Sequence, residues 1–93
     1  MFRHIVLFKI AARHLPVYRA DCRMWAKEAR KHPGFIRYET LERTNAKGQY
    51  ASCYTWRSER DHRRFMDEHH DRLVSLSRCP VEVVGYFNYK NDR

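Results

Sequence analysis

Two runs of alternating side chains constrain the fold of this chain most, because each predicts a β-strand with one bulky face. They span residues 2–10 and residues 49–56. Successive side chains of a strand point to opposite faces of a sheet, so every second residue shares a face. The bulkier faces of the two runs consist of His4, Val6, Phe8, Tyr50, Ser52, Tyr54 and Trp56. If both faces lie on one side of one sheet, they line an aromatic small-molecule pocket that contains a titratable histidine.

The patterns between and after these runs predict the remaining elements. Apolar residues at helical spacing predict a helix that begins near Pro16 and ends at the His-Pro-Gly sequence of residues 32–34, because proline cannot continue a helix. Ser58 and Asp61 resemble a capping box at the start of a second helix. Strands are expected at residues 2–10, 35–41, 49–56 and 81–89, and helices at residues 15–31 and 58–77.

This order, β-α-β-β-α-β, predicts a single ferredoxin-like α+β domain over residues 1–93, with an antiparallel sheet and two helices on one of its faces. The first strand is apolar almost throughout, so we expect it to be buried on both faces. The small residues Ala51, Cys53 and Thr55 are expected to lie under a helix. The open face is then expected to carry large side chains, which are Val6, Phe8, Tyr50, Tyr54 and Trp56.

An exposed patch of that size is rare on a monomer, and two kinds of partner would cover it. One is nucleic acid, whose bases stack on the open sheet of an RNA-recognition motif. Residues 47 and 48 fit the RNA-binding signature of such motifs, but residues 49–52 mismatch it, which argues against nucleic acid. The other is a second copy of the chain, in a homodimer that keeps a cavity between sheet and helices.

Composition bounds the compartment and the partners. The three cysteines, Cys22, Cys53 and Cys79, are an odd number without metal-like spacing, which favours reduced thiols in the cytoplasm. No apolar stretch of the sequence approaches the roughly 20 residues of a membrane helix, so no membrane partner is expected. The net charge of +8 favours an acidic small molecule, an acidic carrier protein or another anionic partner, or reflects a basic surface without a specific partner.

Several short motifs resemble the dimeric α+β barrel superfamily. The first strand, from His4 to Lys9, is similar to the opening strand of its stress-responsive (Dabb-type) group, which includes polyketide cyclases. The His-Pro-Gly-Phe sequence of residues 32–35 and the Trp-Arg-Ser-Glu sequence of residues 56–59 are similar to the antibiotic biosynthesis monooxygenase branch. The resemblance covers nearly the whole chain and implies a homodimer whose sheets form a barrel, with one pocket per subunit.

For the monooxygenase branch, the resemblance implies pocket residues at and after the end of the third strand. Trp56 matches the tryptophan that ends this strand. Ser52 and His62 stand where quinone-forming members have an asparagine and a tyrosine. Met66 stands where haem-degrading relatives have a histidine, so haem degradation is not implied.

For the cyclase branch, the resemblance implies a pocket lined by one histidine of the first strand and one of the second helix. His4 matches the first, and His69 or His70 is similar in place to the second, without the family's His-Pro-x-His sequence. Histidine suits proton transfer because its pKa lies near neutrality. The same residues would be structural if His4 only bonded the backbone and the second helix only packed.

The expected site therefore has two kinds of residue. The catalytic candidates are His4, His62 and His69, and the substrate-binding candidates are Val6, Phe8, Tyr50, Ser52, Tyr54, Trp56, Phe65 and Met66. No metal is expected, because adjacent histidines on a helix diverge by about 100° and the sequence has no metal-binding motif. No cofactor is expected either, because the sequence has no phosphate-binding glycine loop.

The sequence thus predicts an enzyme that needs no cofactor and acts on an aromatic or polyketide-type small molecule. The predicted reaction is a monooxygenase-like oxidation in which a pocket histidine is the base. The alternatives are a polyketide cyclase of the same fold and a non-catalytic ligand-binding dimer.

Overall fold

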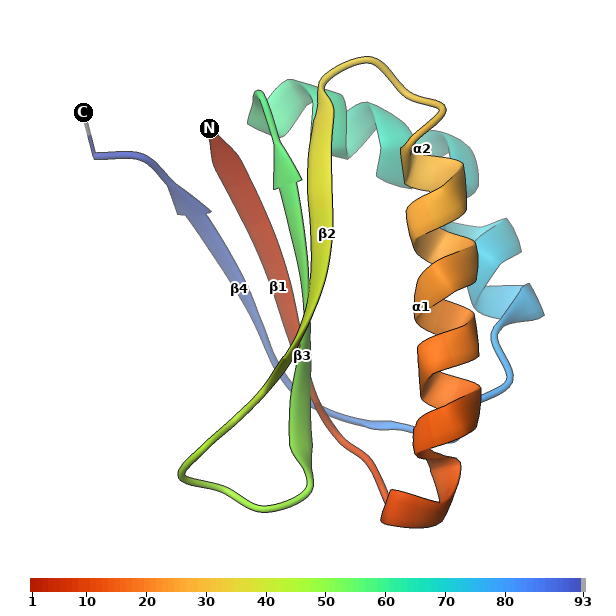
Figure 1. Ribbon diagram of the computed structural model, residues 1–93. Helices are drawn as coiled ribbons and strands as arrows, with labels where there is room; N and C mark the ends of the chain where they lie inside the picture. Colours follow the sequence, from red (N-terminus) through yellow and green to blue (C-terminus); the bar gives the residue numbers. More distant parts are fainter. Residues whose placement is uncertain (93) are drawn as a thin grey trace.

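Four strands and two long helices form two layers in the computed structural model, which describes residues 1–92 (Figure 1). The elements in chain order are β1 (Phe2–Lys9), the 3-10 turn η1 (Ala12–His14), α1 (Leu15–Ala29), β2 (Phe35–Glu42), β3 (Gln49–Trp56), α2 (Glu59–Leu76) and β4 (Glu82–Lys90). Neighbouring strands are antiparallel, in the order β2-β3-β1-β4. Both helices lie on one face of the sheet. The predicted ferredoxin-like α+β fold is confirmed.

Local signals in the sequence fix where the helices begin and end. Pro16 lies in the first turn of α1, where no backbone N–H is needed. After α1 the chain turns at Gly34, whose φ of +87° is a conformation that other residues rarely adopt. A side chain at Gly34 would also collide with the carboxylate of Asp61. Ser58 caps α2, because its hydroxyl accepts a hydrogen bond from the Asp61 backbone N–H at 3.2 Å and donates one to the Asp61 carboxylate at 3.0 Å.

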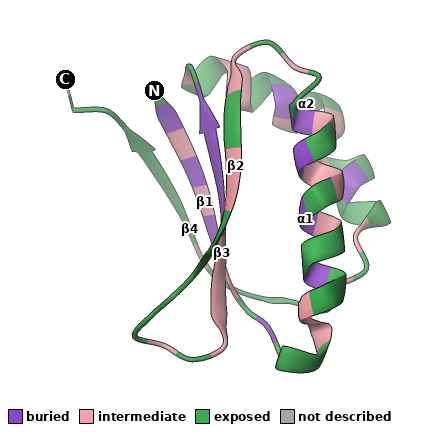
Figure 2. Ribbon diagram, in the orientation of Figure 1, coloured by how far each residue is buried: buried purple, intermediate pink, exposed green. Residues whose placement is uncertain are grey.

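The register between β1 and β3 places their two bulky faces on the same side of the sheet, as the alternation predicts. Opposite pairs on this side are His4 and Tyr54, Val6 and Ser52, and Phe8 and Tyr50. Because β1 also pairs with β4, β1 and β3 are the two central strands and β2 and β4 are the edges. The central position accounts for the concentration of buried residues in β1 and β3 (Figure 2).

The helices cover this bulky face, so the expectation that it is the open face is wrong. Trp56 is fully buried and packs against Phe65 of α2, with ring centroids 5.3 Å apart. At the other end of the sheet, Tyr18 of α1 packs against Phe8 and Tyr50. The large side chains of the core have to come from the sheet, because the buried side of α1 consists largely of small residues. These are Cys22, Ala26 and Ala29.

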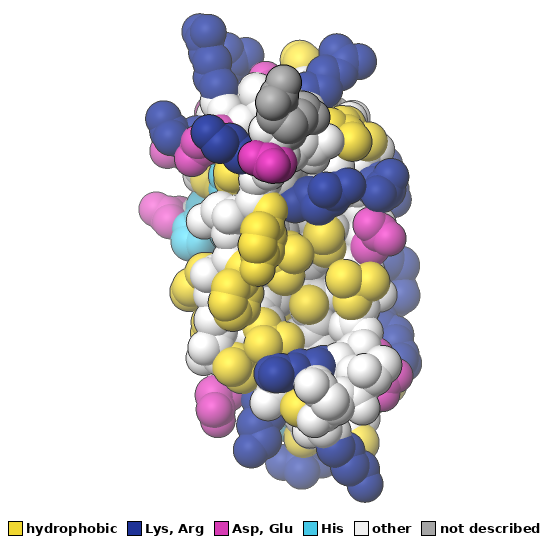
Figure 3. Space-filling view, turned by 90° about the vertical axis from the view of Figure 1, so that its left-hand side faces the viewer, with side chains coloured by type: hydrophobic (Ala, Val, Ile, Leu, Met, Phe, Trp, Pro, Cys, Tyr) yellow, Lys and Arg dark blue, Asp and Glu magenta, His cyan; other side chains and the backbone are white. Residues whose placement is uncertain are grey.

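The open face carries a patch of aliphatic and aromatic side chains, which we call the outer apolar patch. It consists of Ile5, Leu7, Leu41, Phe87 and Tyr89, and lysine and arginine side chains lie around it (Figure 3). Ile5 and Leu7 are half-buried, so the expectation that the first strand is buried on both faces is wrong. The expectation that the small residues of β3 lie under a helix is also wrong. These share the open face and are Ala51, Cys53 and Thr55.

Two further expectations concern the cysteines, which were expected to be reduced, and the helices, none of which was expected to cross a membrane. Cys22 and Cys53 are buried and Cys79 is half-buried, and each is a free thiol. Within residues 1–92, no helix is both long enough and apolar enough to cross a membrane.

Candidate active site

A cavity of about 450 Å³ lies between the inner face of the sheet and the two helices. This volume is within the roughly 300–1,000 Å³ of small-molecule sites in proteins. Its walls come from β1, β3 and β4 on one side and from α1 and α2 on the other. The predicted site residues that line it are His4, Val6, Phe8, Ser52, Tyr54, Trp56, His62, Phe65 and Met66. The structure therefore brings most of the candidate residues together in one place.

Two of the candidate residues lie outside the cavity lining. Tyr50 packs against Tyr18 in the core, with ring centroids 6.3 Å apart. His69 lies against His32 on the outer side of α2, and its neighbour His70 lines the cavity instead. Of the two helical histidines that resemble a cyclase residue in place, His70 is thus the one that lines the cavity.

The cavity also contains residues that the site prediction missed. From α1 and α2 and the loop beyond, the additional lining residues are Tyr18, Asp21, Cys22, Trp25, His70, Val74, Ser77, Cys79 and Val81. The apolar spacing of α1 contains a signal for Tyr18, Cys22 and Trp25, because it places them on one buried side. From β4, Val83 and Tyr86 line the cavity although they are three residues apart. A bulge in the pairing of β1 with β4 breaks the alternation there, so the sequence period could not identify them.

His4 is held by a residue of the last strand. Its Nδ1 lies 2.7 Å from the side-chain oxygen of Asn88, which is opposite His4 across the β1–β4 pairing. An amide oxygen can only accept a hydrogen bond, so the Nδ1 atom carries the proton and donates it. In the neutral ring the lone pair is then on Nε2, which is the atom that could remove a proton from a substrate.

A second histidine ring lies beside the first. The ring centroids of His4 and His62 are 4.4 Å apart, and the Nδ1 atom of His62 is buried without a hydrogen-bond partner among the described residues. Burial lowers the pKa of His62 to about 4, with smaller contributions from the positive charges of His4 and Arg63. Burial also lowers the pKa of His4, although its hydrogen bond to Asn88 acts in the opposite direction. Both rings are therefore neutral at pH 7, the state in which histidine acts as a base.

A group of hydroxyls adds polar contacts to the cavity wall. The Ser52 hydroxyl lies 2.7 Å from the hydroxyl of Tyr18 and accepts a hydrogen bond from Tyr38 at 3.0 Å. Burial raises the pKa of both tyrosines well above the usual value. Both phenols therefore stay protonated and remain available as hydrogen-bond partners, while Ser52 is fixed in place by two contacts.

The rest of the wall near the histidines is aromatic. Trp56 lies with its ring centroid 6.1 Å from that of His62 and 5.1 Å from that of Phe35. Its Nε1 atom is buried and has no hydrogen-bond partner among the described residues. A buried N–H without a partner is unfavourable, and an oxygen atom of a ligand would satisfy it. The arrangement suits a flat ligand that carries oxygen substituents and an acidic proton.

One further group of potential metal ligands lies outside this cavity. His32, Glu68 and His69 present nitrogen and oxygen atoms that all lie within 4.8 Å of one another. The cavity itself brings histidines together with aromatic and aliphatic side chains rather than with carboxylates, apart from Asp21 at the α1 side. The carboxylate of Asp21 accepts hydrogen bonds from the backbone N–H groups of Arg78 and Cys79.

Residues 1–72 match the model of a known family, described as antibiotic biosynthesis monooxygenase. No protein with a curated description matches the chain.

Solved structures share the fold over almost the entire chain. A cofactor-independent oxygenase from Streptomyces nogalater, SnoaB, superposes with a TM-score of 0.80 at 13% identity, over 99% of this chain and 93% of that one. MupZ from Pseudomonas fluorescens gives a TM-score of 0.76 at 16% identity, over 94% of this chain and 69% of that one. A putative antibiotic biosynthesis monooxygenase from Nitrosomonas europaea gives 0.70 at 14% identity, over the full length of both chains. At these identities the likeness establishes the fold.

Proposed function

We propose that this chain, which belongs to the antibiotic biosynthesis monooxygenase family, is an enzyme that needs no cofactor and oxidises an aromatic or polyketide-type small molecule. The observation that carries the proposal is the hydrogen bond from His4 Nδ1 to Asn88, which leaves a neutral Nε2 lone pair in an aromatic cavity. One fold-mate, SnoaB, is described as a cofactor-independent oxygenase.

The chemistry begins with removal of a proton by a neutral histidine. In a phenol next to a CH₂ group, or in a poly-β-ketone, loss of that proton leaves an electron-rich carbanion that can react directly with O₂. Conversion of the CH₂ group to a carbonyl places one oxygen atom in the product and releases the other as water, so the substrate supplies all the electrons. Ser52 and Tyr18 would bind oxygen substituents, and the ring of Trp56 would bind the flat face of the substrate.

A polyketide cyclase is the second candidate. The observation that favours it is the presence of two histidines from different elements, His4 of β1 and His70 of α2, in the same cavity. A cyclase would use the same deprotonation but form a carbon–carbon bond within the substrate, with no need for O₂. A non-catalytic dimer that only binds such ligands is the third candidate.

We also propose that the working form is a homodimer in the cytoplasm. The outer apolar patch supports a homodimer, because a second copy of the chain would bury the same side chains on both partners. The three free thiols support a reducing compartment.

Product analysis under air and under nitrogen tests these proposals. A polyphenol and a poly-β-ketone would each be incubated with the protein and with its His4→Ala and His62→Ala variants. His14→Gln serves as a control, because His14 is half-buried in η1 and does not line the cavity. Turnover that requires air and is lost in His4→Ala supports the oxygenase. Turnover that persists under nitrogen identifies the cyclase instead, and ligand binding without turnover of either substrate leaves only the binding protein.

A further inference from the structure

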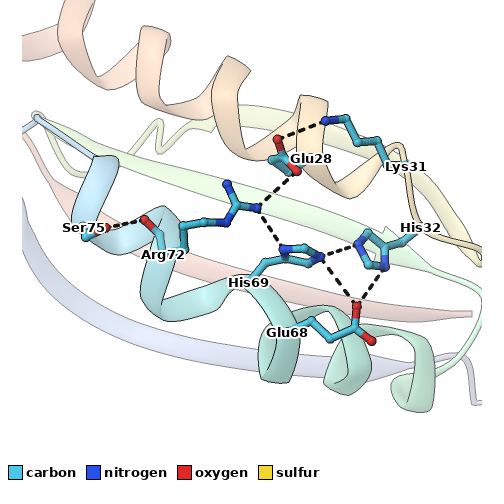
Figure 4. A network of polar contacts seen from close by, with 7 residues as sticks. All are labelled: Glu28, Lys31, His32, Glu68, His69, Arg72 and Ser75. Carbon is cyan, nitrogen blue, oxygen red and sulfur yellow. Dashed lines mark hydrogen bonds and ion pairs between the residues drawn. The ribbon is translucent and has the colours of Figure 1, made fainter.

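A cluster of two histidines and one glutamate lies on the outer side of α2, where that helix meets the turn after α1 (Figure 4). His32 comes from the turn, and Glu68 and His69 are consecutive residues of α2. The Nε2 atoms of the two histidines are 2.7 Å apart. An oxygen of the Glu68 carboxylate lies 3.6 Å from His69 Nε2 and 4.0 Å from His32 Nδ1. We infer that His32, Glu68 and His69 bind a divalent transition-metal ion such as Zn²⁺.

The spacing of the three ligand atoms is close to what one ion requires. A tetrahedral zinc ion bound to two nitrogens at about 2.0–2.1 Å each holds those nitrogens about 3.3–3.4 Å apart. The two histidine nitrogens, at 2.7 Å, therefore need to separate by about 0.6–0.7 Å. Glu68 has a side chain that is 52% exposed, so its carboxylate is free to move the short distance to the ion. Water would fill the remaining coordination positions on the solvent side.

Both imidazole rings are already held in place. The ring of Phe65, which is 1% exposed, packs against His32 and His69 with centroid distances of 5.3 Å and 5.5 Å. The side chains of the two histidines are 14% and 22% exposed. Ligands that are ordered before the ion arrives lose less conformational freedom on binding.

The ligand types select the kind of ion. Imidazole nitrogen suits zinc, copper and nickel ions, whereas magnesium and calcium prefer sites built from oxygen atoms alone. The three ligands do not form a recognisable metal-binding motif in the sequence. Adjacent residues of α2 diverge about the helix axis, but the long Glu68 side chain reaches back beside His69, and His32 joins them from a residue more than 30 positions earlier.

Arg72 opposes binding of the ion. It donates a hydrogen bond to His69 Nδ1 at 2.9 Å, so the neutral ring of His69 carries its proton on Nε2, the atom that faces His32. An ion that takes Nε2 displaces this proton, and the neutral ring must then carry a proton on Nδ1. The Arg72 side chain then has to turn away, and Glu28, which already lies 3.4 Å from it, can hold it there. Glu28 also pairs with Lys31 at 3.2 Å.

Bound metal would join the turn after α1 to the middle of α2. Any ion that binds the folded chain and not the unfolded one raises the midpoint of thermal unfolding by mass action. None of the three ligands lines the cavity, so binding of the ion can be measured separately from the proposed oxidation.

Calorimetric titration of Zn²⁺ into the full chain, without a histidine tag and in a buffer that does not bind metal, tests the inference. One ion per chain is expected in the wild type. Glu68→Gln and His69→Gln should each weaken binding by about tenfold or more, since even outer partners of metal ligands contribute about 10–100-fold. His14→Gln is the matched control and should bind as the wild type does. Arg72→Gln should bind more tightly, because it removes both the positive charge and the competing hydrogen bond.

Nuclear magnetic resonance of the imidazole nitrogens identifies the site directly. Addition of Zn²⁺ should shift the resonances of His32 and His69 and leave those of His14 unchanged. Because the Glu68 side chain is exposed, Glu68→Gln should leave the fold intact, and circular dichroism would check this. The inference is overturned if the wild type binds no Zn²⁺, or if Glu68→Gln and His69→Gln bind it as tightly as the wild type, which would place the ion at other residues such as the cysteines.

Discussion

The Nδ1 atom of His4 and the side-chain oxygen of Asn88 lie 2.7 Å apart, which joins the first strand of the chain to the last one at the margin of the candidate site. The contact fixes the ring orientation of His4 and the nitrogen that bears its proton. Asn88 does not line the cavity, but through this contact it affects Nε2 of His4, the atom proposed to remove the proton from the substrate.

Replacement of Asn88 should reduce turnover without unfolding the protein. In Asn88→Ala the His4 ring is free to rotate and to exchange its proton between the two nitrogens, so we expect turnover to fall by about tenfold or more, within the range that a positioned base contributes. Asn88→Asp should instead raise the pKa of His4, because a carboxylate stabilises the charged ring. Since the base must be unprotonated, the acid limb of the pH–rate profile should then move to higher pH.

Asn91→Ala is the matched control for this prediction, because Asn91 follows the end of β4 and is exposed. It should keep both the rate and the pH profile of the wild type. An Asn88→Asp variant with an unshifted acid limb would show that His4 is not the base.

Acid should destabilise the fold through His62. Its pKa is about 4 in the folded chain and about 6.5 in an unfolded one, so between these values the unfolded chain binds more protons. The free energy of unfolding therefore decreases as the pH falls from about 6.5 to about 4. One such group contributes at most about 1.4 kcal/mol per pH unit, and less here because the ring is partly accessible to solvent, which screens it.

Urea denaturation at pH 7 and at pH 5 measures this effect. His62→Gln removes the titrating group and should make stability less dependent on pH in this window, whereas His14→Gln should leave the dependence as it is. We assign the pH dependence of stability that remains in His62→Gln to His4, whose pKa is also lowered. The assignment to His62 fails if both variants show the full dependence of the wild type.

The two turn glycines should differ in their tolerance of alanine. Gly34 and Gly48 both have positive φ, at +87° and +81°, and a left-handed conformation costs other residues about 1–2 kcal/mol. The Cβ atom of an alanine at position 34 also collides with the carboxylate of Asp61. At position 48 the nearest atom to the added Cβ is the backbone oxygen of Ile10, at 3.8 Å, which is an ordinary van der Waals contact. Thermal unfolding should show a larger loss of stability for Gly34→Ala than for Gly48→Ala, and equal losses would contradict this packing.

A charge in the outer apolar patch should prevent dimerisation. Phe87→Lys and Leu41→Lys each place an ammonium group where two copies of the patch would meet, and an unpaired buried charge is strongly unfavourable. Light scattering is expected to give twice the chain mass for the wild type and the mass of one chain for both variants. Val17→Lys on α1, where Val17 is 37% exposed, should remain dimeric. A monomeric wild type at micromolar concentration would remove the dimer altogether.

The sequence was sufficient for the order and type of the elements. Ser58, Pro16 and Gly34 act on the backbone within a few residues of themselves, so their effect does not depend on the rest of the fold. Alternation likewise identified which residues of β1 and β3 share a face, because the period of a strand is local.

The sequence was not sufficient to decide which face the helices cover. That choice depends on how much volume the helices themselves bring to the core, and Cys22, Ala26 and Ala29 bring little. The sequence also did not decide between His69 and His70. Adjacent residues of a helix diverge about its axis, and which of the two meets the cavity depends on how α2 is rotated against the sheet; His70 lines the cavity, and His69 contacts His32 instead.

The position of Asn88 has a consequence for how such proteins diverge. The family match ends at residue 72, whereas the residue that sets the proton on His4 is on the last strand. A substitution at position 88 could therefore change the basicity of the site while every residue of the matched segment stays the same. Descendants of one ancestral chain could acquire different pH ranges through a single change on an edge strand, while the residues that line the cavity stay the same.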